Sequence, residues 1–217
     1  MASSKYLSTK IAGYVGFFVQ AIVNNFLPIL FIALQDVYKM SYARLAFLIA
    51  VNFGAQIIVD SIAPKVVALI GYRKAAVLAQ FAAFLGLALL GFLPNLISPY
   101  VAIIICIIIY ATGSGLTEVI LSPMIEMLPT RNKSGNMALL HSFYCWGQAA
   151  TVLLTTAAVY IFGFKNWFII PLIWSVVPFI NMFSFLKVPI VEPDPSVKTA
   201  TFFELLKNKR FIIYMLL

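Results

Sequence analysis

The sequence predicts an all-α membrane protein built as a bundle of six transmembrane helices. Of its 217 residues, 63% are hydrophobic and only 10% are charged, with a mean hydropathy of +1.00. A water-soluble core of this size does not need so apolar a composition. Apolar stretches long enough for a helix to cross the hydrocarbon core, about 20 residues, also recur along the chain. They lie at 11–35, 45–63, 75–93, 100–121, 137–162 and 167–186.

Each predicted span is bounded by polar or basic residues. The first, 11–35, starts after Lys10 and lacks a small-residue cleavage site, so we expect it to stay in the mature protein rather than to be a signal peptide. Lys65 and Arg73 separate the second span from the third, and Arg131 separates the fourth from the fifth. The sixth span ends at Lys187. Both cysteines fall inside spans, which indicates packing residues rather than disulfides or metal ligands.

The distribution of basic residues predicts the orientation in the membrane. If the N-terminus is cytoplasmic, only Lys39, Arg44 and Lys165 of the 15 Lys and Arg residues fall in outside loops. Because Lys and Arg are retained on the cytoplasmic side, we expect a multi-pass plasma-membrane protein with a cytoplasmic N-terminus. The net charge of +8 is dispersed over several segments, which excludes a nucleic-acid-binding face and leaves membrane lipid as the expected surroundings.

Polar side chains follow one face of four of the six spans. Spans one, two, four and five each carry them at steps of three or four residues, whereas spans three and six have few and are expected to face lipid as supports. This order, two lined helices and one support, occurs twice and suggests two three-helix repeats, an arrangement in which transporters place a site between repeats. The alternative is that these groups only join helices. The stripes include Gln20 and Asn24, then Asn52, Gln56 and Asp60, then Ser114 and Glu118, and finally His141, Tyr144 and Gln148.

The composition divides the chain into a bundle at 1–188, a cytoplasmic linker at 189–210 and a last apolar run at 211–217. The linker carries three prolines and a basic run that ends at Arg210. Seven apolar residues cannot span a bilayer, so we interpret 211–217 as the start of a seventh helix that is cut off. A longer protein is therefore expected, with a missing C-terminal half or a second copy as partner.

This layout resembles the N-terminal half of a major facilitator superfamily transporter. Within that family the sequence is most similar to fucose-permease-like sugar and proton symporters, through Asn24-Asn25-Phe26-Leu27-Pro28, through 118–123 with Glu118 five residues before Pro123, and through 139–143. The resemblance implies a fold of two six-helix halves, with proton-coupled sugar transport as the activity.

Glu118 is the candidate for proton coupling. Burial in an apolar helix disfavours the charged form of a carboxylate, so the group can exchange a proton within a working pH range. His141, the only histidine of the chain, is expected in the same cytoplasmic third of the bundle and is a natural partner or relay for Glu118. The alternatives are a carboxylate capped by Thr117 or Ser122 and a histidine that reaches the headgroups.

Amide and phenol side chains form the candidate substrate site. Amides offer both donors and acceptors to the hydroxyl groups of a sugar, and a ring can cover the apolar face of the sugar. The residues predicted to bind substrate are Gln20, Asn24, Asn25, Tyr144 and Gln148.

Asp60, near the inner end of the second span, is the candidate gate. It can pair with Arg73, Lys74 or Arg131 only when the cytoplasmic side is closed, which would make the ion pair part of alternating access. The simpler interpretation is an interfacial ion pair with Lys65.

The sequence contains no phosphate loop, zinc motif or nucleophile elbow, so we predict no enzyme, no cofactor and no metal site. Secondary active transport of a small polar solute, a sugar or related compound, coupled to protons, is the predicted function. Efflux of drugs or metabolites and a non-transporting membrane scaffold remain the alternatives.

Overall fold

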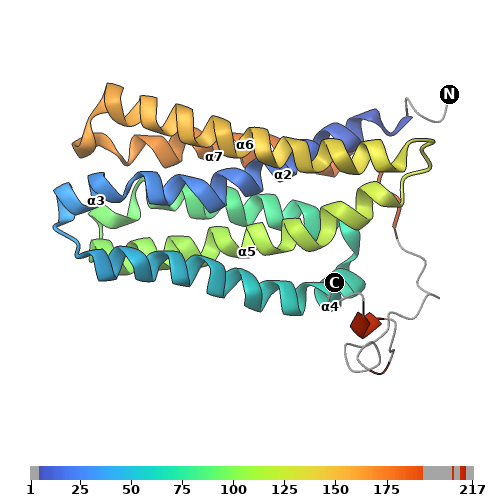
Figure 1. Cartoon of the computed structure of the whole chain (residues 1–217), viewed down its shortest axis with the longest axis horizontal. Coiled ribbons are helices and arrows are strands. Elements are labelled where there is room, and N and C mark those ends of the chain that lie inside the picture. Colours follow the sequence, from blue (N-terminus) through green and yellow to red (C-terminus); the bar gives the residue numbers. More distant parts are fainter. Residues whose placement is uncertain (1–4, 193–206, 208–210, 214–217) are drawn as a thin grey trace.

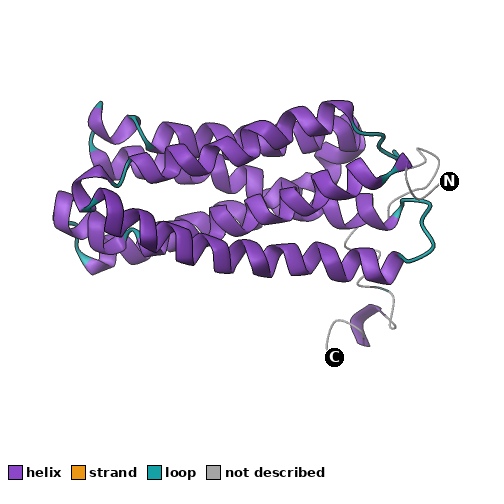
Figure 2. Ribbon diagram, turned by 90° about the horizontal axis from the view of Figure 1, so that it is seen from above, coloured by secondary structure: helices purple, strands orange, loops and turns teal. Residues whose placement is uncertain are grey.

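The computed structural model describes residues 5–192, 207 and 211–213 of the chain. The expected seventh helix and most of the linker therefore lie largely outside the described residues. Five long helices run along the same direction and form one elongated bundle (Figure 1). Loops join them at the two ends, and the described part of the chain contains helices without strands (Figure 2). We call the two ends the Gly71 end and the Lys39 end, after a residue in a connection at each.

The first predicted span is divided in two. Helix α2 (Leu7–Ile29) contains Pro28, and α3 (Phe31–Tyr38) follows after Leu30. Proline has no N–H to donate and its ring clashes with the carbonyl four residues earlier, so the helix is interrupted there. Lys39, in a left-handed conformation with φ of 52°, then ends α3. The helical region reaches from residue 7 to 38 and is longer than the predicted span.

The second and third spans follow each other directly as two helical segments with a break at one residue. Helix α4 (Tyr42–Leu90) has non-helical angles at Gly71, with φ of 81° and ψ of 164°. Positive φ values combined with extended ψ are accessible almost only to glycine, so the break between the two helical segments depends on this residue. We call 42–70 the first arm and 72–90 the second arm. The predicted loop between the spans shrinks to this single residue.

Helix α5 (Pro99–Glu126) is the central element because both arms of α4 pack against it. A Cβ on Gly113 would lie 2.5 Å from the carbonyl oxygen of Ala79 in the second arm, and one on Gly115 would lie 3.0 Å from Val59 in the first. Small residues let helix backbones approach this closely, and such packing drives helix association in membranes.

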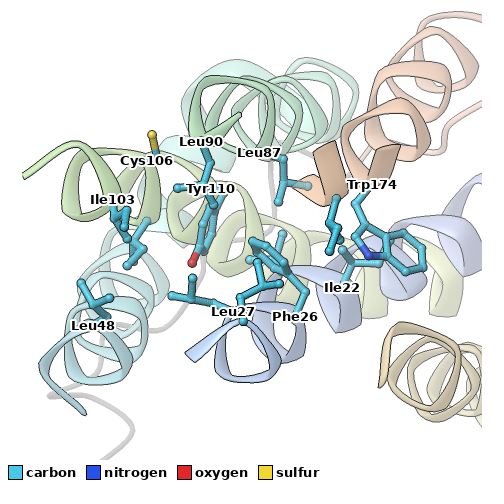
Figure 3. Packing of buried hydrophobic residues seen from close by; sticks show 14 of the residues in the cluster. Ile22, Phe26, Leu27, Leu48, Leu87, Leu90, Ile103, Cys106, Tyr110 and Trp174 are labelled. Carbon is cyan, nitrogen blue, oxygen red and sulfur yellow. The ribbon is translucent and has the colours of Figure 1, made fainter. Parts of the chain in front are cut away.

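The apolar interior consists of two clusters along the bundle. The cluster nearer the Lys39 end surrounds Tyr110, which is fully buried and packs edge-to-face on Phe26 with ring centroids 5.9 Å apart (Figure 3). Such aromatic pairs contribute about 0.5–1.5 kcal/mol beyond burial. The cluster nearer the Gly71 end includes Phe17 and Phe185. Gln20 of α2 lies in sequence between members of the two clusters, and the polar side chains described below gather around it.

The last two helices complete the bundle. Helix α6 (Lys133–Phe162) begins at Asn132, whose side chain accepts a hydrogen bond from the N–H of Gly135. It packs on α2, where Gly147 lies against Phe18, but only 17% of its most apolar 18-residue stretch is buried. Helix α7 (Ile169–Lys187) follows a short 3-10 turn, Phe164–Asn166. Most of α6 therefore presents its surface outside this bundle.

Length and composition make five helices of the described chain able to cross a membrane, with α4 counted once. Since α4 consists of two arms, this agrees with the six predicted spans. The spans supposed to be lipid-facing supports also carry interior polar groups. Gln80 of the second arm and Asn181 of α7 are both buried, and the Asn181 amide donates to the Gln80 side-chain oxygen over 3.3 Å.

Candidate functional site

The carboxylate of Glu118 is the centre of a polar cluster between three helices. Its Oε2 atom accepts a hydrogen bond of 2.9 Å from Nε2 of Gln20 on α2 and one of 2.7 Å from Nε2 of Gln56 in the first arm of α4. Both glutamines are buried, with 4% and 8% of their surface exposed. Glu118 itself is exposed to the adjacent cavity, so the burial of this carboxylate expected from the sequence is not found. These two N–H donors hold this carboxylate oxygen beside the cavity.

This carboxylate faces a cavity of about 410 Å³. The volume falls within the range of about 300–1,000 Å³ that small-molecule sites occupy. The cavity combines a carboxylate, an imidazole, a phenol, a hydroxyl and three amides with two aromatic rings. Its lining consists of Phe17, Gln20, Asn24, Phe53, Gln56, Glu118, Ser122, His141 and Tyr144.

His141 and Tyr144 reach the cavity from α6, one helical turn apart. The imidazole of His141 lies edge-on to the ring of Phe17, with centroids 5.4 Å apart. The structure thus brings Glu118 and His141 into one cavity, as the sequence predicted, although no hydrogen bond between them occurs among the described residues. Whether either group carries a coupled proton stays a prediction.

The predicted substrate residues separate into two groups. Gln20, Asn24 and Tyr144 line the cavity, and Asn24 Oδ1 also accepts a hydrogen bond of 3.2 Å from the hydroxyl of Ser114. Asn25 instead bonds the carbonyl oxygen of Ala21 in its own helix, and Gln148 is exposed beyond the cavity lining. Adjacent residues of a helix point about 100° apart, so Asn24 and Asn25 cannot face the same space.

The candidate gating residues lie apart from one another. Asp60 forms no ion pair with Arg73 or Arg131 in the described part of the chain. Arg73 Nη1 instead donates to the carbonyl oxygens of Phe185 and Leu186, both over 2.9 Å, at the C-terminal end of α7. Arg131 is exposed in the connection between α5 and α6. The gate stays a prediction for another conformation.

A second, larger hollow of about 660 Å³ lies between α2, α3 and α6 near the Lys39 end. Its lining is mostly apolar, and its only side-chain polar groups are the hydroxyls of Thr156 and Tyr160. Its lining contains no carboxylate or imidazole, in contrast to the smaller cavity around Glu118.

A comparison with protein families decides the classification. The sequence model of the Major Facilitator Superfamily matches residues 13–217. This chain belongs to the Major Facilitator Superfamily. The family consists of transporters and not enzymes, and the chain is a multi-pass membrane protein with an all-helical portion of the family fold. No match was found among curated proteins.

Solved structures of this superfamily share the fold at low identity. The proton:xylose symporter XylE, bound to 6-bromo-6-deoxy-D-glucose, gives a TM-score of 0.74 at 16% identity and covers 88% of this chain. The E. coli fucose:proton symporter FucP gives 0.71 at 15% identity and covers 94%. A peptide transporter in complex with sulfate gives 0.58 at 17% identity and covers 80%. The chain spans 46%, 55% and 37% of these proteins respectively.

Gln56 of this site and Glu192 at the Gly71 break are two residues that the sequence prediction did not select. Gln56 lies four residues from both Asn52 and Asp60 on one face of α4, and this spacing is the signal that marks it. Glu192 accepts backbone N–H bonds from Tyr72 and Arg73 at the Gly71 break, 2.6 and 3.1 Å long. It follows the last span, where the sequence offers no periodic pattern.

Proposed function

We propose that this chain is one half of a secondary transporter that moves a small polar solute, a sugar or related compound, by proton-coupled alternating access. The observation that supports this most is Glu118, which lines the cavity and is held by two buried glutamine amides. A carboxylate beside a solute cavity can take up a proton from one side of the membrane and release it on the other.

Amides and a phenol support a polar solute. Gln20 and Asn24 can donate and accept hydrogen bonds with hydroxyl groups, and Tyr144 adds a ring and a hydroxyl. The solved structures of proton-linked xylose and fucose symporters share the fold and fit this proposal. Asn25 and Gln148 could contribute in a state in which the helices have moved.

The other half of the cavity must come from a second element. All residues that line it belong to α2, the first arm of α4, α5 and α6, and the surface of α6 is largely uncovered. We propose that a C-terminal half or a second copy closes the cavity. The distribution of basic residues supports a cytoplasmic N-terminus in a plasma membrane, and Asp60 with Arg73 and Arg131 would form the gate when that side is closed.

The test is solute uptake by the full-length protein in vesicles with an imposed pH gradient. Glu118→Gln should abolish gradient-driven accumulation and retain exchange of labelled for unlabelled solute, because the neutral amide cannot carry the proton. Glu126→Gln is the matched control, since this carboxylate lies two turns further along α5 and is exposed. Undiminished accumulation in Glu118→Gln would overturn the proposal.

Efflux of an amphipathic compound is the second candidate, and the apolar hollow of about 660 Å³ favours it. The same vesicles loaded with a lipophilic cationic dye distinguish the two. Efflux predicts that the dye leaves the vesicles in exchange for protons entering down the same inward gradient and that this exchange depends on Glu118, whereas sugar uptake predicts no dye movement.

A further inference from the structure

Several buried oxygen atoms near Glu118 have no hydrogen-bond partner among the described residues. They are Oε1 of Gln20, Oε1 of Gln56 and Oδ1 of Asp60. Buried polar atoms are rarely left unpaired, because each costs about 1–3 kcal/mol. An oxygen can accept a hydrogen bond but cannot donate one without a proton, so an all-oxygen set lacks donors. The cluster therefore needs an added proton or another donor.

The helix register places Asp60 beside the Glu118 cluster. Asp60 follows Gln56 by four residues and shares its face of α4. Its Oδ1 packs against α5, because a Cβ on Gly115 would lie 2.8 Å from that atom. Gly115 precedes Glu118 by one turn on the same helix. Both carboxylates thus lie at the contact between α4 and α5, close to the amide of Gln56.

The amide of Gln56 has the chemistry to bridge them. Its Nε2 already donates to Glu118, and its Oε1 is free to accept. A proton on Oδ1 of Asp60 would turn this unpaired oxygen into a donor for Oε1 of Gln56. One proton would then satisfy two of the buried oxygens at once.

We propose that Asp60 and Glu118 share one proton through the side-chain amide of Gln56. In the first arrangement, which keeps the observed hydrogen bond from Gln56 to Glu118, Asp60 is protonated and donates to Gln56, and Gln56 donates to the ionised Glu118. In the alternative arrangement the amide turns by 180°, so that Glu118 is protonated and donates to Oε1, and Nε2 donates to the ionised Asp60. The pair holds one proton and one negative charge in both arrangements.

The amide links the protonation states of the two carboxylates by turning, so the proton taken up and the proton released are different ones and neither crosses it. When Glu118 takes a proton from the cavity, Gln56 turns and its N–H group stabilises the Asp60 carboxylate, whose proton is released. The net result is the gain of one proton at Glu118 and the loss of one at Asp60. This inference rests on the proton coupling proposed above and adds Asp60 as a proton carrier and Gln56 as a positioning residue.

No ion pair in the described part of the chain compensates the negative charge of these two carboxylates. Helix α5 contributes Glu118, α2 contributes the neutral Gln20, and α6 contributes His141 and Tyr144 across the cavity. No lysine or arginine forms an ion pair with either carboxylate in the described part of the chain. Two ionised carboxylates at one helix contact would repel each other, and a shared proton removes that repulsion.

Infrared difference spectroscopy of the purified full-length protein tests the inference, because a protonated carboxylic acid has its own C=O stretching band. Near neutral pH we expect such a band, shifted by ¹³C-carboxyl-labelled aspartate and lost in Asp60→Asn. Asp36→Asn, which removes an exposed carboxylate 3.7 Å from Lys39, should leave the band unchanged. Absence of the band in wild type, or its persistence in Asp60→Asn, would overturn the inference.

The bridge is tested with Gln56→Leu, which removes the acceptor of the Asp60 proton and should move the aspartate band. Asn52→Leu is the matched control, because Asn52 is also a buried amide with an unpaired oxygen, one turn earlier on α4. An unmoved band in a folded Gln56→Leu protein, with folding checked by thermal denaturation, would contradict the bridge.

Transport distinguishes this inference from the proposed function. Asp60→Asn should reduce gradient-driven uptake by at least tenfold. Wild-type uptake in Asp60→Asn, together with loss in Glu118→Gln, would defeat the shared proton and leave the transporter proposal standing. An aspartate band without any gradient-driven transport in wild type would support the shared proton and defeat the transporter proposal.

Discussion

Glu118 and Glu192 are two carboxylates that each accept two N–H bonds, but from donors of different kinds. Glu118 is held by the side-chain amides of Gln20 and Gln56, whereas Glu192 is held by the backbone N–H groups of Tyr72 and Arg73. A side-chain amide can turn and present an oxygen instead, so it can serve a carboxylate or a carboxylic acid. A backbone N–H at a helix start can only donate.

This difference separates a site that can change state from one that is fixed. Glu192 lies at the N-terminal end of the second arm of α4, where the helix dipole also favours a negative charge. Arg73 in turn bonds the last carbonyl groups of α7. Together they fasten the segment after α7 to the Gly71 break. Glu118 instead opens onto the cavity, where a change of protonation can be linked to solute binding.

The largest expected effect comes from removing both amides around Glu118. Gln20→Leu combined with Gln56→Leu leaves the ionised carboxylate without its two hydrogen bonds, each of about 1.5–3 kcal/mol for a charged group. Initial rates of gradient-driven uptake by the full-length protein should therefore fall by roughly 100-fold or more. Ser61→Ala is the control, since that exposed hydroxyl bonds only the carbonyl oxygen of Ile57 in its own helix. Near-normal rates in the double variant would show that the amides do not serve the carboxylate.

The next effect concerns the backbone that presents the donors to Glu192. In Gly71→Ala the new residue must adopt a φ of 81°, and its Cβ would lie 3.1 Å from Oε2 of Glu192. Such backbone strain costs about 1–3 kcal/mol, so thermal unfolding in detergent should occur at a lower temperature. Gly54→Ala is the matched control.

Gly54 lies within a regular helix and has open space around its Cβ position. Alanine there should be neutral or stabilise by about 0.5–1 kcal/mol. Equal stability of both variants would mean that the Gly71 break does not constrain the fold, and the contrast between the two carboxylates would lose its structural basis.

The six spans could be predicted because crossing a membrane requires long apolar helices, and their length and composition can be read directly from the sequence. The cavity could be predicted only in part. Periodicity puts His141 and Tyr144 on one face of α6, but Gln148 lies about 10 Å further along that helix than His141 and misses the cavity. The spacing of polar residues does not determine which helices pack together or how each is rotated about its axis.

Partners far apart in the sequence were the least predictable. Gln20 was expected to bind solute, yet its Nε2 is used by Glu118, which lies 98 residues away. The bond between Glu192 and the N–H of Tyr72 joins residues 120 positions apart, and no local pattern announces it. Such contacts depend on the packing of α2 against α5 and of α4 against α7 and the segment after it, which sequence periodicity does not determine.

The smallest expected effect, Glu192→Gln, decides whether the two carboxylates truly differ. Glutamine keeps an acceptor oxygen for the backbone N–H groups but loses the charge, which at a helix N-terminus contributes about 0.3–1 kcal/mol. Stability in detergent should fall by about that amount, and gradient-driven uptake should stay within roughly twofold of wild type, a change of about 0.4 kcal/mol. Because its donors cannot turn, Glu192 has no means of exchanging a proton that its substitution could remove. A loss of driven uptake as complete as that of Glu118→Gln, in a protein of normal stability, would place Glu192 in the coupling mechanism and refute the division between a fixed and a switching carboxylate.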